Sequence, residues 1–170
     1  SGFGNGYSEN RLCYIDLRTF STHVNTMPDR LDDVVTLLLV NADGATNPQL
    51  ATHFEAAQIT QYAYVIPSGT ANSMAENAAW PTLQSMIANN TRLVTFIAGM
   101  PPTSMAETIP YISNQFDYVF ETAFQNTSPQ NFSCIPDRPQ NVAGDIPNAM
   151  AGGWLPLLNH FLYEEQAFFD

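Results

Sequence analysis

Polar side chains that can bind ligands or transfer protons follow several apolar runs of this chain. Asn41 and Asp43 come directly after the run 34–40, and Glu121 lies within "YVFETAF". A carboxylate at the end of a buried segment can act as a general base or accept hydrogen bonds from substrate hydroxyls. Asn and Asp also form turns and helix caps, and this interpretation of Asn41 and Asp43 stays equally open.

Further candidates lie toward the C-terminal end of the chain. Arg138 stands between prolines in "IPDRP", where a rigid loop would aim its guanidinium at a phosphate or a carboxylate. An ion pair with Glu121 explains Arg138 as well. Asn159 and His160 lie inside the apolar run "WLPLLNHFL", where buried polar groups need hydrogen-bond partners. This pair forms either the wall of a site or a structural hydrogen-bond network.

The elements that must position these residues alternate along the chain. Apolar runs predict strands at 34–40, 62–66, 93–98 and 118–122, and successive starts are separated by 28, 31 and 25 residues. Between them, "NPQLATHFEAAQ", "WPTLQSMIANN" and "MAETIPYISNQF" predict helices, with Asn47 as the first N-cap. A loop rich in Pro, Asn and Ser follows at 125–147. The run 154–162 predicts a fifth strand or the start of a helix.

This alternation predicts an α/β fold with a parallel sheet that is covered on both faces. On this interpretation the strand 33–41 is hydrophobic on both sides because both of its faces are buried. Asn41, Asp43 and Glu121 would then converge at the carboxyl ends of the strands. Either an open doubly wound sheet fits, or part of a (β/α)₈ barrel, which usually needs ~250 residues. We expect one domain over 1–170, with a flexible stretch at 1–12.

The charge balance excludes some classes of partner. The chain has 5 basic and 16 acidic residues, a formal net charge of −11, and its cations are all arginines. Nothing resembles a basic patch, so nucleic acid and anionic membranes are not expected as electrostatic partners. No apolar run approaches the ~20 residues of a transmembrane helix. The composition fits a secreted protein.

Together with the charge balance, the sequons favour export, whereas the cysteines leave several states open. Cys13 and Cys134 permit one disulfide, although each could stay unpaired or pair elsewhere. Asn-x-Ser/Thr sequons at Asn89, Asn126 and Asn131 predict a glycoprotein. The three histidines show no metal-ligand spacing, and two distant cysteines do not suit zinc, so we expect no metal site.

Seven blocks, taken in order, resemble secreted fungal proteins related to phosphatidylinositol-specific phospholipase C, the PLC-like phosphodiesterases of the X-domain type. The blocks are "DVVTLLLVN", "YAYVIPSG", "WPTLQSMI", "RLVTFIAG", "YISNQFDYVFET", "CIPDRP" and "NHFL". The resemblance runs over 33–162. It implies a TIM-type barrel, of which the segments here are the middle and later part, a secretory route, and a place in lipid metabolism.

The resemblance also implies a chemistry that this chain supplies only in part. The family uses one histidine as general base and another as general acid, one of them in a Gly-Ala/Thr-His-Asp/Asn motif. That motif does not occur in the chain, and the region of Cys13 offers only Asn10 and Tyr14. The family's "ETPY" reads "ETAF" at 121–124. The favoured explanation is a fragment whose catalytic half lies elsewhere, and the alternative is a divergent scaffold without activity.

On this basis we expect a phosphoric diester hydrolase or lyase of the phospholipase C type. Glu121, Asp43 and His160 are the catalytic candidates, and the candidates for contacting a phosphodiester or an inositol-containing headgroup are Asn41, Arg138 and Asn159. No cofactor is expected, with calcium as the weaker alternative. An incomplete parallel barrel exposes unpaired edges, so we expect a missing half, a second copy or a remodelled closure to complete the sheet.

Overall fold

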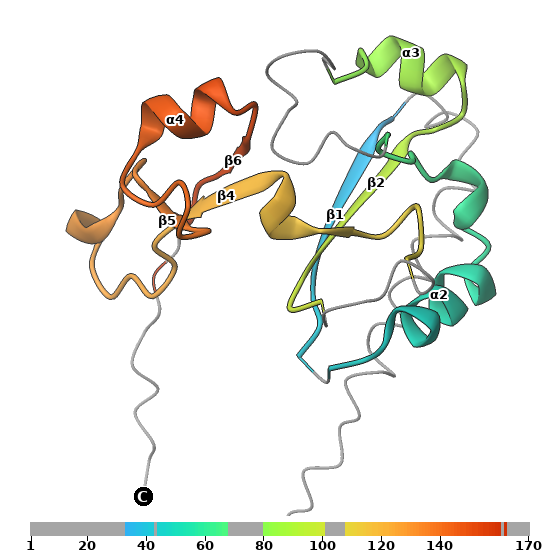
Figure 1. The fold of residues 1–170 in the computed structure, drawn as a ribbon, viewed down its shortest axis with the longest axis horizontal. Helices are drawn as coiled ribbons and strands as arrows, with labels where there is room; N and C mark the ends of the chain where they lie inside the picture. Colours follow the sequence, from blue (N-terminus) through green and yellow to red (C-terminus); the bar gives the residue numbers. More distant parts are fainter. Residues whose placement is uncertain (1–32, 43, 68–79, 101–107, 161, 163–170) are drawn as a thin grey trace, which may run out of the picture. The chain divides into compact units, whose positions relative to one another are not determined.

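The computed structural model describes residues 33–42, 44–67, 80–100, 108–160 and 162 (Figure 1). These residues divide into two units with separate sheets. The first unit comprises the described residues up to Pro67 together with Pro81–Asn114. The second unit comprises Trp80 and the described residues from Gln115 onward. None of the helices in these ranges has the length and apolar character needed to cross a membrane.

A parallel sheet forms the centre of the first unit. Strand β1 (Val35–Val40) pairs with β2 (Leu93–Ala98) along its whole length, and β2 pairs on its other side with the short β3 (Ser113–Asn114). Both pairings are parallel, and the blue and yellow-green strands lie side by side in Figure 1. The prediction that 34–40 and 93–98 run in the same direction is therefore confirmed. A complete barrel stays a prediction.

Helix α2 (Asn47–Ala56) follows β1 because a strong start signal stands between them. The side chains of Thr46 and Gln49 form a reciprocal capping box, in which Gln49 Oε1 accepts from Thr46 N at 2.8 Å. Pro48 occupies the first turn, where its missing N–H costs nothing. The predicted helix is present, and its cap is Thr46 rather than Asn47.

The core of the first unit lies between α2 and the sheet. Leu50 and Phe54 of α2 pack with Ile59 and with Leu93 and Ile97 of β2. All five side chains are at most 8% exposed. Burial of a side chain of this size contributes about 1.5–3 kcal/mol, so this cluster is the main stabilising element of the unit.

Strand β1 departs from the prediction that both of its faces are buried. Exposure alternates along the strand, and Thr36, Leu38 (43% exposed) and Val40 (77% exposed) all lie on the open face. Within the described residues β1 has β2 as its strand neighbour on one side only. Central β2 is the strand that is buried on both faces. The prediction was wrong because apolar content alone does not reveal which strand is central.

Two other predicted elements of the first unit are absent from the described residues. In place of a strand at 62–66, a 3₁₀ turn (η2, Thr60–Tyr62) leads into an isolated bridge between Ala63 and Leu93. The predicted third helix is also wrong for its described part, 108–116, which holds β3 and the start of η4 (Gln115–Asp117). Pro110 explains this outcome, because it removes an N–H donor and disfavours helical geometry at the residue before it. The second predicted helix is present as α3 (Leu83–Ala88), capped by Thr82.

The second unit is built around a mixed sheet. Central β4 (Val119–Thr122) pairs with β6 (Leu155–Leu157) in parallel and with β5 (Pro136–Arg138) in the antiparallel sense. The segment 125–147 is not a plain loop, because it holds η5 (Pro129–Asn131), β5 and the first residues of α4 (Ile146–Ala151).

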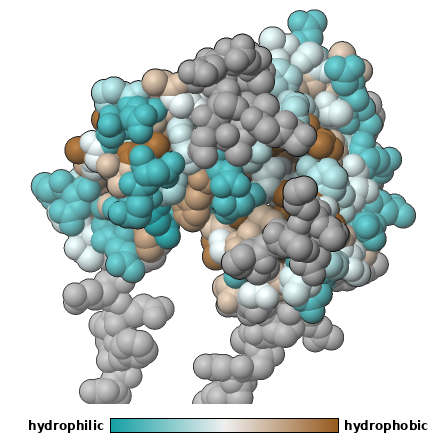
Figure 2. Space-filling model, viewed as in Figure 1, coloured by the Kyte–Doolittle hydropathy of each residue, from teal (hydrophilic) through white to brown (hydrophobic). Residues whose placement is uncertain are grey.

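A small core supports this mixed sheet. Phe120 of β4 packs with Val142, with Ala149 of α4 and with Trp154, and each is at most 6% exposed. Hydrophobic residues also reach the surface, as the brown areas of Figure 2 show, and Ile146 and Met150 on α4 are among the exposed ones.

Candidate functional site at the end of strand β4

A charged pair lies at the carboxyl end of β4. Glu121, whose side chain is only 7% exposed, forms an ion pair through Oε1 with Nη2 of Arg138. The pairing of the strands explains this contact, because Arg138 lies directly opposite Glu121 across the antiparallel β4–β5 ladder. On the parallel side, Leu157 of β6 is the register partner of Glu121. The central strand thus brings residues from both neighbouring strands to one place.

Asn159, two residues beyond β6, completes the contacts of the carboxylate. Its Nδ2 lies 3.3 Å from Glu121 Oε2 and 2.7 Å from the carbonyl oxygen of Thr122, so one amide group donates to both. The backbone N–H of Asn159 donates to Thr122 Oγ1 at 2.9 Å. These bonds tie the chain after β6 to the end of β4 and fix the orientation of the Asn159 side chain.

Asn126 holds Asn159 from the other side. Asn126 is 2% exposed, and its Nδ2 donates to the carbonyl oxygens of Ala123 at 2.9 Å and Asn159 at 3.1 Å. Buried polar groups normally find partners in this way, since an unpaired amide or carbonyl loses its hydration without compensation. We call Glu121, Thr122, Asn126, Arg138 and Asn159 the β4 polar cluster.

Arg138 is the member of the β4 polar cluster that reaches solvent. Its side chain is 40% exposed, and its guanidinium carbon lies 4.4 Å from the ring centroid of Phe124 and 5.3 Å from that of Phe116. Aromatic faces at these distances attract a guanidinium. Within the described residues Arg138 Nε is buried without a hydrogen-bond partner. A guanidinium that is fixed on one side and open on the other suits an anionic group such as a phosphate.

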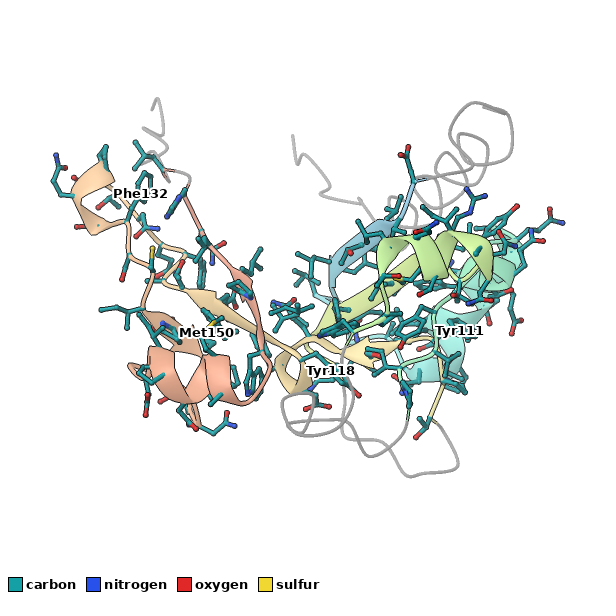
Figure 3. All side chains as sticks on the ribbon, turned by 90° about the horizontal axis from the view of Figure 1, so that it is seen from above. Tyr111, Tyr118, Phe132 and Met150 are labelled. Atoms are coloured by element: carbon teal, nitrogen blue, oxygen red, sulfur yellow. The ribbon has the colours of Figure 1, made fainter. Side chains whose placement is uncertain are left out.

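The structure separates two neighbours that the sequence groups together. Asn159 points into the β4 polar cluster, whereas His160 is exposed and its ring lies 5.1 Å from that of Phe132. Phe132 follows η5 directly and is labelled in Figure 3. Of the two interpretations of this pair, the structural hydrogen-bond network holds for Asn159. His160 is not part of that network, and its ring packs on Phe132 instead.

Asn41 has a structural role in the first unit. Its Oδ1 accepts from Ala45 N at 2.8 Å, and its Nδ2 donates to the carbonyl oxygens of Ala45 at 2.9 Å and Gly99 at 3.3 Å. The turn interpretation of Asn41 is therefore confirmed. Asp43 lies outside the described residues. Glu121 belongs to the second unit, and the predicted common rim of Asn41, Asp43 and Glu121 stays a prediction.

The remaining predicted sites differ in exposure. Asn89 and Asn131 are exposed, whereas Asn126 is buried in the β4 polar cluster. Cys134 is exposed and forms no disulfide within the described residues, and Cys13 lies outside them. No group of three or more His, Cys, Asp or Glu side chains is close enough to hold a metal ion in the part of the chain that the structure describes.

Asn126, Phe116 and Phe124 belong to the site although they were not predicted as parts of it. The two phenylalanines flank β4 and could have been predicted, because aromatic residues beside a strand that pairs with an arginine-bearing strand can stack on the guanidinium. Asn126 was obscured by its sequon, which suggests a surface position. Its partner Asn159 lies 33 residues away, and nothing local in the sequence points to that contact.

Comparison with known proteins agrees with the resemblance in the sequence. A family model described as PI-PLC X 1 matches residues 15–167. The chain is 33% identical over 147 residues to "PI-PLC X domain-containing protein 1" of the fungus Arthroderma benhamiae, which covers 86% of this chain and 42% of that protein. A second protein of the same fungus, called "Uncharacterized secreted protein", is 29% identical over 110 residues, or 65% of this chain and 23% of its own length.

The chain thus spans less than half the length of either relative. No solved structure matches it. Because the family model covers most of the sequence and a relative that is 33% identical over 147 residues carries the same domain, this chain belongs to the PI-PLC X domain family.

Proposed function

We propose that this chain is part of an extracellular phosphodiesterase domain of the phospholipase C type, and that the β4 polar cluster binds the headgroup of its substrate. Family membership supports the reaction class. A relative that is called secreted supports the location, as do the exposed sequons at Asn89 and Asn131. The barrel stays part of the proposal, supported by the parallel pairing of β1, β2 and β3.

The state of Arg138 is the observation that carries the binding role. Glu121 holds the guanidinium on one side and two aromatic rings pack near it, while 40% of the side chain remains exposed. A guanidinium held in this way loses little further conformational freedom when it binds a phosphate oxygen. The buried carboxylate of Glu121 is engaged with a cation and an amide, so we assign it the orientation of Arg138 rather than proton transfer.

The reaction proposed for the domain is an in-line displacement at phosphorus. A hydroxyl of the headgroup attacks the phosphorus as a general base takes its proton, the bond to the leaving alcohol breaks, and a general acid protonates that alcohol. The resemblance implies two histidines for these transfers, and this chain lacks the motif that carries one of them. We therefore assign headgroup binding to this chain and leave the proton transfers to residues outside the β4 polar cluster.

A second candidate is a catalytically inactive secreted protein that binds the same headgroups on the same fold. The position of His160 favours it, because this catalytic candidate packs on Phe132 rather than joining the β4 polar cluster. On either proposal the exposed face of β1, and the edge that has no strand neighbour in the part of the chain that the structure describes, would be covered by further strands of the domain or by a second copy of the chain, since exposed apolar edges promote association.

Binding and turnover can be measured on the same preparation of the full chain. The binding probe is glycerophosphoinositol, a water-soluble phosphodiester of inositol, titrated by calorimetry. Turnover is the release of inositol phosphate from phosphatidylinositol vesicles, followed from acidic to mildly alkaline pH. We expect Arg138→Met to weaken binding at least ~10-fold, equal to about 1.4 kcal/mol. Arg138→Lys keeps the positive charge but loses the planar guanidinium. Its affinity for the probe should therefore lie between those of the unmodified chain and Arg138→Met.

The outcomes separate the candidates. The control Leu158→Ala removes an exposed side chain near the cluster and should leave binding unchanged. Absence of probe binding by the unmodified chain would overturn both candidates. Binding that depends on Arg138, with turnover, supports the phosphodiesterase. The same binding without turnover at any pH, in a longer protein that also contains the segment to which the proton transfers are assigned, supports the inactive binding protein.

A further inference from the structure

We infer that the three sequons are not equivalent: Asn126 is a structural asparagine that carries no glycan, whereas Asn89 and Asn131 are the acceptors of N-linked glycans. This inference rests on the extracellular location in the proposed function, and it goes beyond that function by assigning the modified positions. Sequence alone treats the three sites alike, because each satisfies the Asn-x-Ser/Thr pattern.

Both N–H groups of the Asn126 side chain are engaged in hydrogen bonds, so neither is available for attachment of a sugar. A side-chain amide has two N–H groups, and those of Asn126 reach the carbonyl oxygens of Ala123 and Asn159. Attachment of a glycan replaces one of these hydrogens with a bond to carbon, so at least one carbonyl loses its donor. The residue is also only 2% exposed, and a close-packed interior has no space for a saccharide. A chain with a glycan on Asn126 cannot adopt this fold.

The position of Asn126 in the β4 polar cluster makes such a glycan doubly disruptive. Asn126 holds the carbonyl of Asn159, and Asn159 in turn donates to Glu121 and to the carbonyl of Thr122. Displacement of the Asn126 amide would therefore release the segment that supports Glu121. Chains modified there should be retained as misfolded rather than secreted, so secreted molecules should lack that glycan.

The other two sequons lie where a glycan can extend into solvent. Asn89 is the exposed C-cap residue of α3, and the following Asn90 has φ +56°, which turns the chain away from the helix. Asn131 is exposed at the end of η5. A glycan at either position replaces water at the surface. It breaks no side-chain hydrogen bond between that asparagine and another described residue.

The test removes each sequon without changing its asparagine. The full chain is secreted from a eukaryotic host behind a leader peptide, and glycans are counted by intact mass before and after enzymatic deglycosylation. Thr91→Ala and Ser133→Ala should each remove one of two glycans. Ser128→Ala, which leaves the Asn126 side chain in place, should remove none. Because the leader imposes the secretory route, an inactive protein with two glycans would contradict the proposed activity and leave this inference intact.

Glycopeptide mapping of the unmodified protein gives an independent answer that does not depend on the folding of any variant. A glycan on Asn126 in secreted protein would overturn the inference, and so would an unmodified Asn89 or Asn131. A second set of variants tests the structural role. Asn126→Gln should lower the unfolding temperature without changing the number of glycans, whereas Asn89→Gln and Asn131→Gln should each lose a glycan and cause a smaller shift in that temperature.

Discussion

The side-chain amide of Asn159 lies 3.3 Å from the carboxylate of Glu121, although 38 residues separate them in the sequence. This contact is the middle link of a series that runs from Asn126 through Asn159 and Glu121 to Arg138. In a buried network each bond orients the next, so the exposed guanidinium depends on an asparagine that it does not touch. The β4 polar cluster should therefore respond to substitution as a unit.

Asn159→Ala is expected to destabilise the second unit. It leaves Glu121 Oε2 and the carbonyl of Thr122 without their shared donor, and a buried acceptor left unpaired costs roughly 1–3 kcal/mol. Urea unfolding followed by tryptophan fluorescence measures this, because Trp80 and Trp154 both belong to the second unit. Leu158→Ala, at an exposed neighbour, serves as the control, and equal losses in the two variants would contradict the role of Asn159.

Substitutions of the two partners of the ion pair are expected to lower the free energy of unfolding by different amounts. Arg138→Met leaves a buried carboxylate without its cation and should cost roughly 1–3 kcal/mol, the usual cost of a buried acceptor that loses its partner. Glu121→Leu should cost less, because Arg138 is 40% exposed and water can hydrate it. The double variant should be more stable than Arg138→Met alone, since it removes both charges. Unfolding free energies of the four proteins form a double-mutant cycle, and strictly additive losses would show that the pair is not coupled.

Gly99 is expected to tolerate Asn better than Ala. It has φ +76° directly after β2, and its carbonyl accepts from Asn41. An alanine in the left-handed region costs roughly 1–2 kcal/mol, whereas asparagine adopts it more readily. Hydrogen exchange of the β2 amides reports on this unit, because the first unit contains no tryptophan. Gly99→Asn and Gly99→Ala with the same loss of protection would contradict this account.

Alkaline pH is expected to destabilise the first unit. Burial raises the pKa of Tyr64, and burial together with the negative charge of Glu55 raises the pKa of Tyr111, which is labelled in Figure 3. The unfolded phenols ionise near pH 10, before the folded ones. The unfolded state then binds fewer protons, so stability falls as the pH rises above about 10 and is unaffected by these groups below it.

Tyr111→Phe should reduce that dependence, and Glu55→Gln should reduce it less because the carboxylate is the smaller cause. Tyrosinate absorbance during titration, together with thermal unfolding at each pH, measures both effects. A slope that is unchanged in Tyr111→Phe would show that this phenol does not contribute.

The sequence predicted the elements that carry their own signals. The apolar runs that became β1, β2 and β4 act locally, so a window of the sequence is sufficient to find them. The start of α2 was found in the same way, although its cap is Thr46 rather than the predicted Asn47. β3 and β5 have only two and three residues, too few to show a period. The segment 62–66 has the composition of a strand, yet whether it pairs depends on which edges of β2 remain open, and that is decided by the tertiary structure.

The site was predictable to a similar extent. The sequence suggested an ion pair of Glu121 with Arg138 as one alternative, and it required partners for a buried Asn159. It did not distinguish Asn126 from the other sequons. Asn126 is buried because of contacts across the sheet with residues that are distant in the sequence. A local sequence pattern does not indicate such contacts.

The edge of β1 that has no strand neighbour within the described residues has a consequence for how the protein is made. Val35–Val40 carries no charge and no proline, the features that usually stop one strand from adding to another. Newly synthesised copies that meet before their sheets are covered are expected to aggregate through these six residues. The rate of such encounters rises with the square of the concentration of unfolded chains, whereas the rate of folding rises only in proportion to it. Slow expression should therefore give a larger soluble fraction of the protein than rapid expression.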